Sequence, residues 1–223
     1  MTATASEVPL SGDNRLGAIL CDLSSKGWSW QPQMLPDALY HALRAEVLAA
    51  NAEDDLTPAG IGREADFQLD RTIRKSRIAW MDGSTPAQAS FLAWTEHLRE
   101  ALNRGLMLGL FEFEACFAVY QPGEFYDRHL DSFEGVRNRI VSLVVYLNED
   151  WAEDDGGALI VWPEGADEAA EPAAHILPKR AGVVFMLSET VPHAVEVTNK
   201  SRFGIAAWWR VNPSIQGHID PLA

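Results

Sequence analysis

The second half of the chain consists largely of short runs of β-branched and aromatic residues, and this pattern limits the fold more than any other feature of the sequence. Gly, Pro, Asp and Asn separate the runs from one another. Such spacing is typical of an antiparallel sandwich or barrel and not of alternating βαβ units. From residue 113 onward the runs are FEACFAVYQ, RIVSLVVYLN, GALIVW, GVVFMLS, HAVEVT and FGIAAWWRV.

The first half carries helical patterns instead. Within residues 35–50, the apolar side chains of Leu39, Leu43 and Val47 recur at the spacing of one helix face. A second amphipathic pattern over residues 90–108 predicts another helix. We expect the first of these helices to belong to the scaffold and not to the functional site.

The order of helices followed by strands indicates one α+β domain. Residues 1–15 are small and polar and predict a flexible tail. Residues 76–82 predict a strand between the two helices, and no internal repeat divides the chain. A length of 223 residues can bury a full core without disulfides or structural metals. We therefore expect a single domain over residues 1–223.

Composition excludes several classes of partner. The chain has 18 basic and 32 acidic residues, a net charge of −14, which argues against a binder of nucleic acid or of anionic membranes. Its two cysteines, Cys21 and Cys116, are too few for a disulfide framework and favour a reducing compartment. No signal-peptide pattern and no stretch of ~18 apolar residues is present. We expect a cytoplasmic protein that spans no membrane.

One short fragment, YDRHLDSF, carries potential ligands for a metal ion. His129 and Asp131 lie two positions apart, so on an extended segment their side chains point to the same side. His193 stands at the start of a later apolar run, and Arg202 at the start of the next. Two histidines and one carboxylate form the facial triad that binds Fe(II) and leaves positions open for substrate and oxygen. A nearby arginine could grip a dicarboxylate co-substrate bidentately.

These residues and their neighbours resemble the Fe(II)- and 2-oxoglutarate-dependent oxygenases. Within that family they are similar to the prolyl 4-hydroxylase-like branch, which includes the oxygen-sensing animal enzymes and their bacterial relatives. The resemblance implies a double-stranded β-helix, a cupin-like jelly roll, with its core over residues 113–210 and with supporting N-terminal helices. It covers residues from about 65 to 210 and rests on YQPGEFYDRHLDSF, NRIVSLVVYLNEDW, GGALIVWPEG and SETVPHAVEVTNKSRFGIAAWW.

The resemblance also implies roles for single side chains at the iron and the co-substrate. His129, Asp131 and His193 would hold the iron. Arg202 would pair with the distal carboxylate of 2-oxoglutarate, and Tyr146 would hydrogen-bond to the same carboxylate. No further catalytic residue is expected beyond the metal centre.

Five other side chains are expected around this centre on the same basis. Tyr120 and Trp208 would line the pocket of the co-substrate, whereas Tyr126, Arg139 and Arg74 would meet the substrate. Arg74 belongs to the segment IRKSRIAW, next to a loop that closes over the peptide in the family. Ordinary core packing explains the two tyrosines and Trp208 equally well, and a solvated arginine at a strand edge is the alternative for Arg139.

The implied activity is hydroxylation of a prolyl residue in a protein or peptide. Its cofactors would be Fe(II), 2-oxoglutarate and O2, with ascorbate as an optional reductant, and its co-products succinate and CO2. Proline as the target comes from the family and from no residue of this chain. Two alternatives stay open: hydroxylation of a free amino acid or small natural product, and a metal-binding jelly roll without turnover. The sequence does not indicate an oligomeric state.

Overall fold

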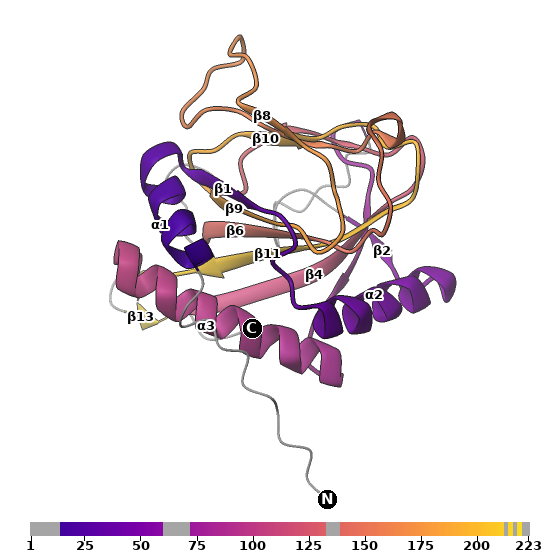
Figure 1. Ribbon diagram of the computed structural model, residues 1–223, viewed down its shortest axis with the longest axis horizontal. Helices are drawn as coiled ribbons and strands as arrows, with labels where there is room; N and C mark the ends of the chain where they lie inside the picture. Colours follow the sequence, from indigo (N-terminus) through magenta and orange to yellow (C-terminus); the bar gives the residue numbers. More distant parts are fainter. Residues whose placement is uncertain (1–13, 60–71, 133–138, 212–213, 216–217, 220–223) are drawn as a thin grey trace, which may run out of the picture.

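Two antiparallel sheets face each other in the computed structural model, and helices cover the outer face of the larger sheet (Figure 1). The structure describes residues 14–59, 72–132, 139–211, 214–215 and 218–219. This is the expected double-stranded β-helix of an α+β domain. None of the described helices combines the length and the apolar composition needed to cross a lipid bilayer.

The larger sheet has seven strands, and β11 lies at its centre. Along β11 the side chains alternate: Ile205, Ala207 and Trp209 pack in the core beneath the helices, whereas Ala206 and Trp208 face the smaller sheet. The strand order is β1 (Trp28–Gln31), β9 (Val183–Leu187), β6 (Arg139–Tyr146), β11 (Arg202–Arg210), β4 (Glu112–Tyr120), β3 (Arg77–Trp80) and β2 (Thr57–Pro58).

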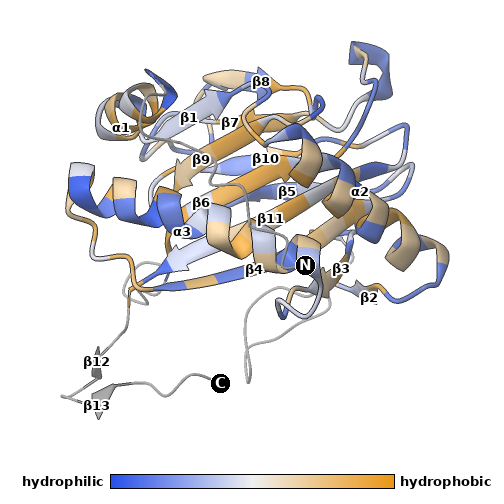
Figure 2. Ribbon diagram, turned by 60° about the horizontal axis from the view of Figure 1, so that its bottom comes forward, coloured by the Kyte–Doolittle hydropathy of each residue, from blue (hydrophilic) through white to orange (hydrophobic). Residues whose placement is uncertain are grey.

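The smaller sheet has four short strands and lies opposite the central strands of the larger one (Figure 1). Its order is β5 (Tyr126–His129), β10 (His193–Val195), β7 (Leu159–Val161) and β8 (Ala174–Ile176). A short 3-10 helix η2 (Glu153–Asp155) precedes β7, and β12 (Ser214–Ile215) pairs with β13 (His218–Ile219) near the C-terminus. Figure 2 shows that many residues along the strands, including those of β9 and β10, are hydrophobic.

Both predicted helices are confirmed, as α2 (Asp37–Ala52) and α3 (Pro86–Leu106). Helix α3 begins four residues before the predicted start, because Thr85 caps it by accepting a hydrogen bond from the backbone N–H of Gln88 and Pro86 occupies its first turn. It ends at Met107, whose left-handed backbone closes the last turn. Apolar faces of both helices bury Leu43, Phe91 and their neighbours against the larger sheet.

The sequence analysis did not predict the first helix of the described chain. Helix α1 (Asn14–Lys26) begins inside the segment 1–15 that the sequence predicts as a tail; residues 1–13 of that segment lie outside the described residues. Ile19 and Leu23 are buried, and a Cβ at Gly105 of α3 would collide with Leu20. Tertiary packing of one apolar face therefore stabilises this helix despite its small and polar residues.

Candidate metal centre

Three side chains converge at one end of the space between the sheets. His129 ends β5, His193 begins β10, and the two residues pair directly across the antiparallel ladder. Asp131 follows β5 by two positions, and its carboxylate lies 3.7 Å from His129 Nε2 and 3.4 Å from His193 Nε2. One potential ligand atom from each of the three residues lies within 4.8 Å of the others. The structure thus brings together the metal ligands that the sequence predicts.

Both imidazoles are oriented by backbone carbonyls. The Nδ1 atom of His129 lies 2.7 Å from the carbonyl oxygen of Asp127, and Nδ1 of His193 lies 3.1 Å from that of Val191. Because a carbonyl only accepts, each Nδ1 carries the proton and leaves the Nε2 lone pair for a metal ion. Burial and the neighbouring His193 lower the pKa of His129, which favours the neutral, ligating form.

Asp131 is held by Ser142 of the larger sheet and by Ser188, which directly follows strand β9. The hydroxyl of Ser142 on β6 donates to Asp131 Oδ2 at 2.6 Å and lies 2.8 Å from the hydroxyl of Ser188. The backbone N–H of Asp131 donates to the carbonyl of Ser188 at 3.1 Å. Burial alone would raise the pKa of Asp131, but attraction to His193 and hydrogen bonds with both imidazoles hold this pKa well below its usual value. The carboxylate therefore stays ionised.

A buried arginine and a buried tyrosine present unsatisfied polar atoms in the same inter-sheet space. Arg202 is 3% exposed and donates from Nε to the carbonyl oxygen of Gly157 at 2.9 Å. Neither its Nη2 atom nor the hydroxyl of the fully buried Tyr146 has a hydrogen-bond partner among the described residues. The guanidinium carbon lies 5.2 Å from the centre of the Tyr146 ring. Burial raises the pKa of Tyr146 to about 12, so its hydroxyl is a neutral donor.

Two more of the predicted tyrosines lie between these groups and the histidines. Tyr120 pairs with Arg202 across the sheet and has its ring centre 5.2 Å from the guanidinium carbon. Tyr126 stacks on His129, with ring centres 3.6 Å apart. The guanidinium carbon of Arg74 lies 4.6 Å from the centre of the Tyr126 ring, and its Nε donates to the hydroxyl of Ser76. Tyr126 thus links Arg74 to the histidine.

Trp208 and Arg139 lie next to each other on two central strands of the larger sheet, β11 and β6. Trp208 pairs with Ser142 and faces the smaller sheet, whereas the neighbouring Trp209 is buried beneath the helices. Arg139 stacks on Trp208 at 3.7 Å and forms an ion pair with Glu114 at 2.8 Å. It is therefore not the solvated strand-edge arginine that the sequence left open.

Sequence reasoning missed several residues that complete this site. Ser142 interrupts the apolar run of β6 and Ser188 directly follows that of β9, and both are buried. A lone serine within or directly after a buried strand is the signal that could have found them. Gly157, read as a turn, supplies the carbonyl that orients Arg202. Trp80 lies on β3 with its ring centre 6.3 Å from that of Trp208 and is 55% exposed.

Comparison with known protein families points to the same chemistry. The sequence model of the 2OG-Fe(II) oxygenase superfamily matches residues 115–210, which include both histidines, Asp131 and Arg202. Among curated proteins, Egl nine homolog 1 from Homo sapiens is 29% identical over 157 residues. That alignment covers 67% of this chain and 35% of the human protein, so the chain spans about a third of that relative's length.

Solved structures extend the comparison over most of the chain. A Pseudomonas putida prolyl-4-hydroxylase is 40% identical, with a TM-score of 0.78 over 87% of this chain and 98% of that one. A prolyl hydroxylase from Trichoplax adhaerens, solved with a peptide fragment of hypoxia inducible factor, shares the fold. Its TM-score is 0.76 at 21% identity, over 88% of this chain and 89% of that one.

Proposed function

The chain belongs to the 2OG-Fe(II) oxygenase superfamily, on its prolyl 4-hydroxylase-like branch, and we propose on this basis that it hydroxylates a prolyl residue in a protein or peptide. The cofactors are those of the superfamily: Fe(II), 2-oxoglutarate and O2. The observation that carries the proposal is the convergence of two imidazoles and one carboxylate beside a buried guanidinium that has an unsatisfied donor.

The proposed ligands of Fe(II) are His129, Asp131 and His193. Their donor set of two imidazole nitrogens and one ionised carboxylate fits that ion and leaves coordination positions for other molecules. Bound Fe(II) supplies the oxidative chemistry, in which O2 converts 2-oxoglutarate to succinate and CO2 and hydroxylates a C–H bond. The protein's part is to fix the three side chains, and Ser142 does so for the carboxylate through its 2.6 Å hydrogen bond.

Arg202 and Tyr146 are the proposed partners of the distal carboxylate of 2-oxoglutarate. An unpaired buried donor costs free energy, so the free Nη2 atom and the free hydroxyl favour a ligand that accepts from both. A carboxylate meets this need and also balances the buried positive charge of Arg202. Tyr120, which lies against the same guanidinium, would close the side of this pocket.

The proposed substrate contacts surround the metal ligands on the side of Tyr126 and Trp208. Arg74 and Tyr126 border the histidines, and Arg139 on Trp208 borders Asp131 through Ser142. The exposed Trp80 stands next to this group. An exposed indole beside a buried metal centre favours a substrate large enough to cover it, and a peptide segment meets that requirement better than a free amino acid.

The test has two steps. Purified protein is first incubated with Fe(II), 2-oxoglutarate and ascorbate in air, and succinate is measured, with Asp131→Ala as the control. Peptides from a treated lysate are then searched by mass spectrometry for prolyl residues that gain one oxygen atom. Prolyl oxidation that depends on Asp131 supports the proposal. Turnover stimulated only by free amino acids or small metabolites would show that the substrate is a small molecule and not a peptide. Iron binding without any succinate would indicate a metal-binding module without turnover.

A further inference from the structure

A second pocket opens beside Trp30, on the side of the fold where the edges of the two sheets separate. It lies between β1, the edge strand of the larger sheet, and β8, the edge strand of the smaller one, and has a volume of about 450 Å³. No residue proposed above to bind iron, 2-oxoglutarate or substrate lines it. We propose that this pocket binds a flat, mainly apolar molecule that carries one negative charge.

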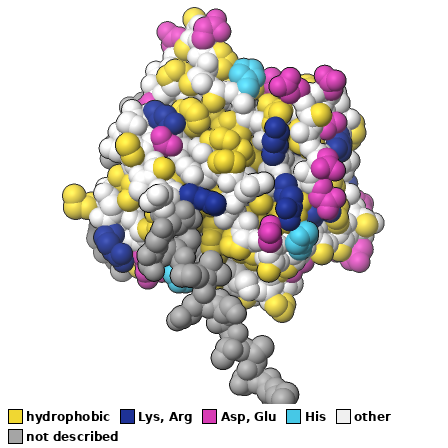
Figure 3. All heavy atoms as spheres, viewed as in Figure 1, with side chains coloured by type: hydrophobic (Ala, Val, Ile, Leu, Met, Phe, Trp, Pro, Cys, Tyr) yellow, Lys and Arg dark blue, Asp and Glu magenta, His cyan; other side chains and the backbone are white. Residues whose placement is uncertain are grey.

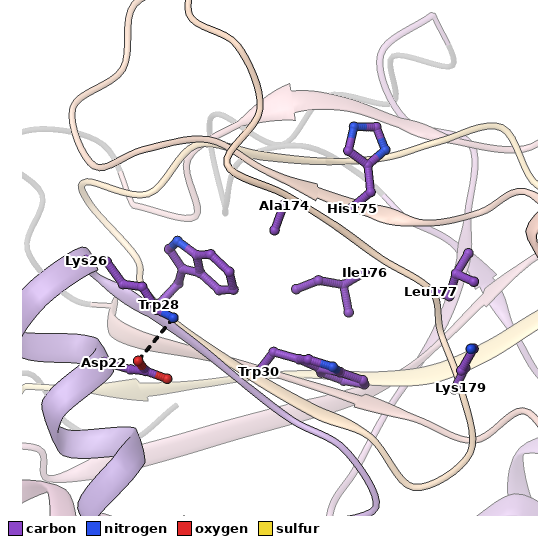
Figure 4. Close-up of a pocket in the computed structure, with 9 residues that line it drawn as sticks. All are labelled: Asp22, Lys26, Trp28, Trp30, Ala174, His175, Ile176, Leu177 and Lys179. Carbon is purple, nitrogen blue, oxygen red and sulfur yellow. Dashed lines mark ion pairs between the residues drawn. The ribbon is translucent and has the colours of Figure 1, made fainter.

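The walls of the pocket are apolar and partly aromatic. Trp28 and Trp30 occupy alternate positions of β1 and both face the interior, as their partners Met186 and Val184 do. From the opposite edge, Ala174 and Ile176 of β8 point toward the two indoles, whereas His175 points away (Figure 4). Two indoles and an aliphatic side chain offer flat surfaces on which a ring system can stack.

The inner wall of the pocket is held rigidly by its neighbours, so few side chains need to become ordered when a ligand binds. Trp30 packs against Tyr146, with ring centres 5.7 Å apart, and fits so closely over Gly182 that a Cβ there would collide with its ring. Buried Ser29 donates to Asp22 at 2.8 Å and so ties β1 to α1. A rigid wall reduces the entropy lost on binding. The Trp30–Tyr146 contact also separates this pocket from the proposed 2-oxoglutarate site.

Charge at the rim selects for one negative group. Lys26 is paired with Asp22 at 3.0 Å, and its ammonium lies 4.3 Å from the centre of the Trp28 ring. Lys179 is exposed and forms no ion pair with any residue in the described part of the chain. The charges of Lys26 and Asp22 cancel each other, so Lys179 contributes the remaining positive charge at the mouth of the pocket. Figure 3 shows hydrophobic side chains gathered in the middle of this face, with Lys and Arg side chains beside them.

Isothermal titration of the full chain with naphthalene-2-sulfonate tests the proposal. We expect saturable binding with one site per chain, and weaker binding of 2-naphthalenemethanol, which has the same ring without the charge. Lys179→Gln should weaken sulfonate binding about two- to fivefold, because one exposed charge contributes little. Trp28→Ala should weaken binding of both compounds about tenfold or more. Arg104→Gln removes an exposed charge on α3 and should change the binding of neither compound.

The sulfonate could instead enter the proposed 2-oxoglutarate site, and Arg202→Ala separates the two cases. Our proposal predicts unchanged binding in Arg202→Ala and in the presence of saturating 2-oxoglutarate. Absence of binding to the unmodified chain would overturn it. So would binding that disappears in Arg202→Ala and persists in Lys179→Gln. Because succinate formation is measured separately, neither result bears on the proposed oxygenase function.

Discussion

Ser142→Ala tests whether the two serines position the metal-binding carboxylate. Ser142 is 1% exposed, and its hydroxyl donates to Asp131 Oδ2 at 2.6 Å. A hydrogen bond to a charged group contributes ~1.5–3 kcal/mol. At ~1.4 kcal/mol for each factor of ten, Fe(II) affinity should fall about 10- to 100-fold, which agrees with the effect of removing an outer partner of a metal ligand.

The assay is anaerobic titration of the protein with Fe(II), accompanied by far-ultraviolet circular dichroism to confirm folding. Ser90→Ala is the matched control, because its hydroxyl donates to Pro86 at 2.8 Å on the exposed face of α3. Ser188→Ala should have a smaller effect than Ser142→Ala, since Ser188 reaches the carboxylate side chain only through the other hydroxyl. Fe(II) binding by Ser142→Ala that matches the unmodified protein would refute the positioning role.

Substitutions at three further residues probe the proposed 2-oxoglutarate site, chiefly through succinate formation. Arg202→Ala should raise the KM for 2-oxoglutarate about 100-fold or more, because a buried carboxylate loses its charge partner, and Arg202→Lys should recover part of the loss; an unchanged KM would assign this role to another cation. Tyr146→Phe should weaken 2-oxoglutarate binding while the ligand-free protein keeps or gains thermal stability, because an unsatisfied buried hydroxyl is removed; a clear drop in the ligand-free Tm would show that the hydroxyl has a partner. Gly157→Ala places a Cβ 2.9 Å from Thr198 Oγ1 and 3.2 Å from Arg202 Cδ at a φ of +65°, so the KM should rise roughly tenfold with Fe(II) affinity unchanged; equal loss of both would point to general misfolding.

The strands of the jelly roll were predictable because their residues are apolar on both faces and separated by turn-forming residues. The segments that the sequence did not reveal depend on their partners. Helix α1 contains Gly17 and a Ser24–Ser25 pair and is held by Leu20 against α3. Strand β8 has only three residues within a polar stretch, and it exists because β7 pairs with it. Tertiary contacts, which no local pattern records, decide both cases.

The ligating residues of the site could be predicted, whereas their supports could not. His129, Asp131, His193 and Arg202 are residue types whose chemistry limits their roles, and the structure brings them into one region. Ser142 hydrogen-bonds to Asp131 only because the register of β6 against β11 and β9 turns its side chain toward the segment after β5. Register is set by the packing of whole sheets, so a single serine in an apolar run does not disclose its partner.

The most direct test of the account is the position of iron in crystals grown anaerobically with Fe(II) and 2-oxoglutarate. Anomalous diffraction at the iron edge locates the ion without reference to activity. The account predicts one peak bounded by Nε2 of His129, Nε2 of His193 and the carboxylate of Asp131, with the distal carboxylate of 2-oxoglutarate on Arg202. Iron bound by other side chains, or a 2-oxoglutarate molecule that leaves Arg202 and Tyr146 without a partner, would contradict it.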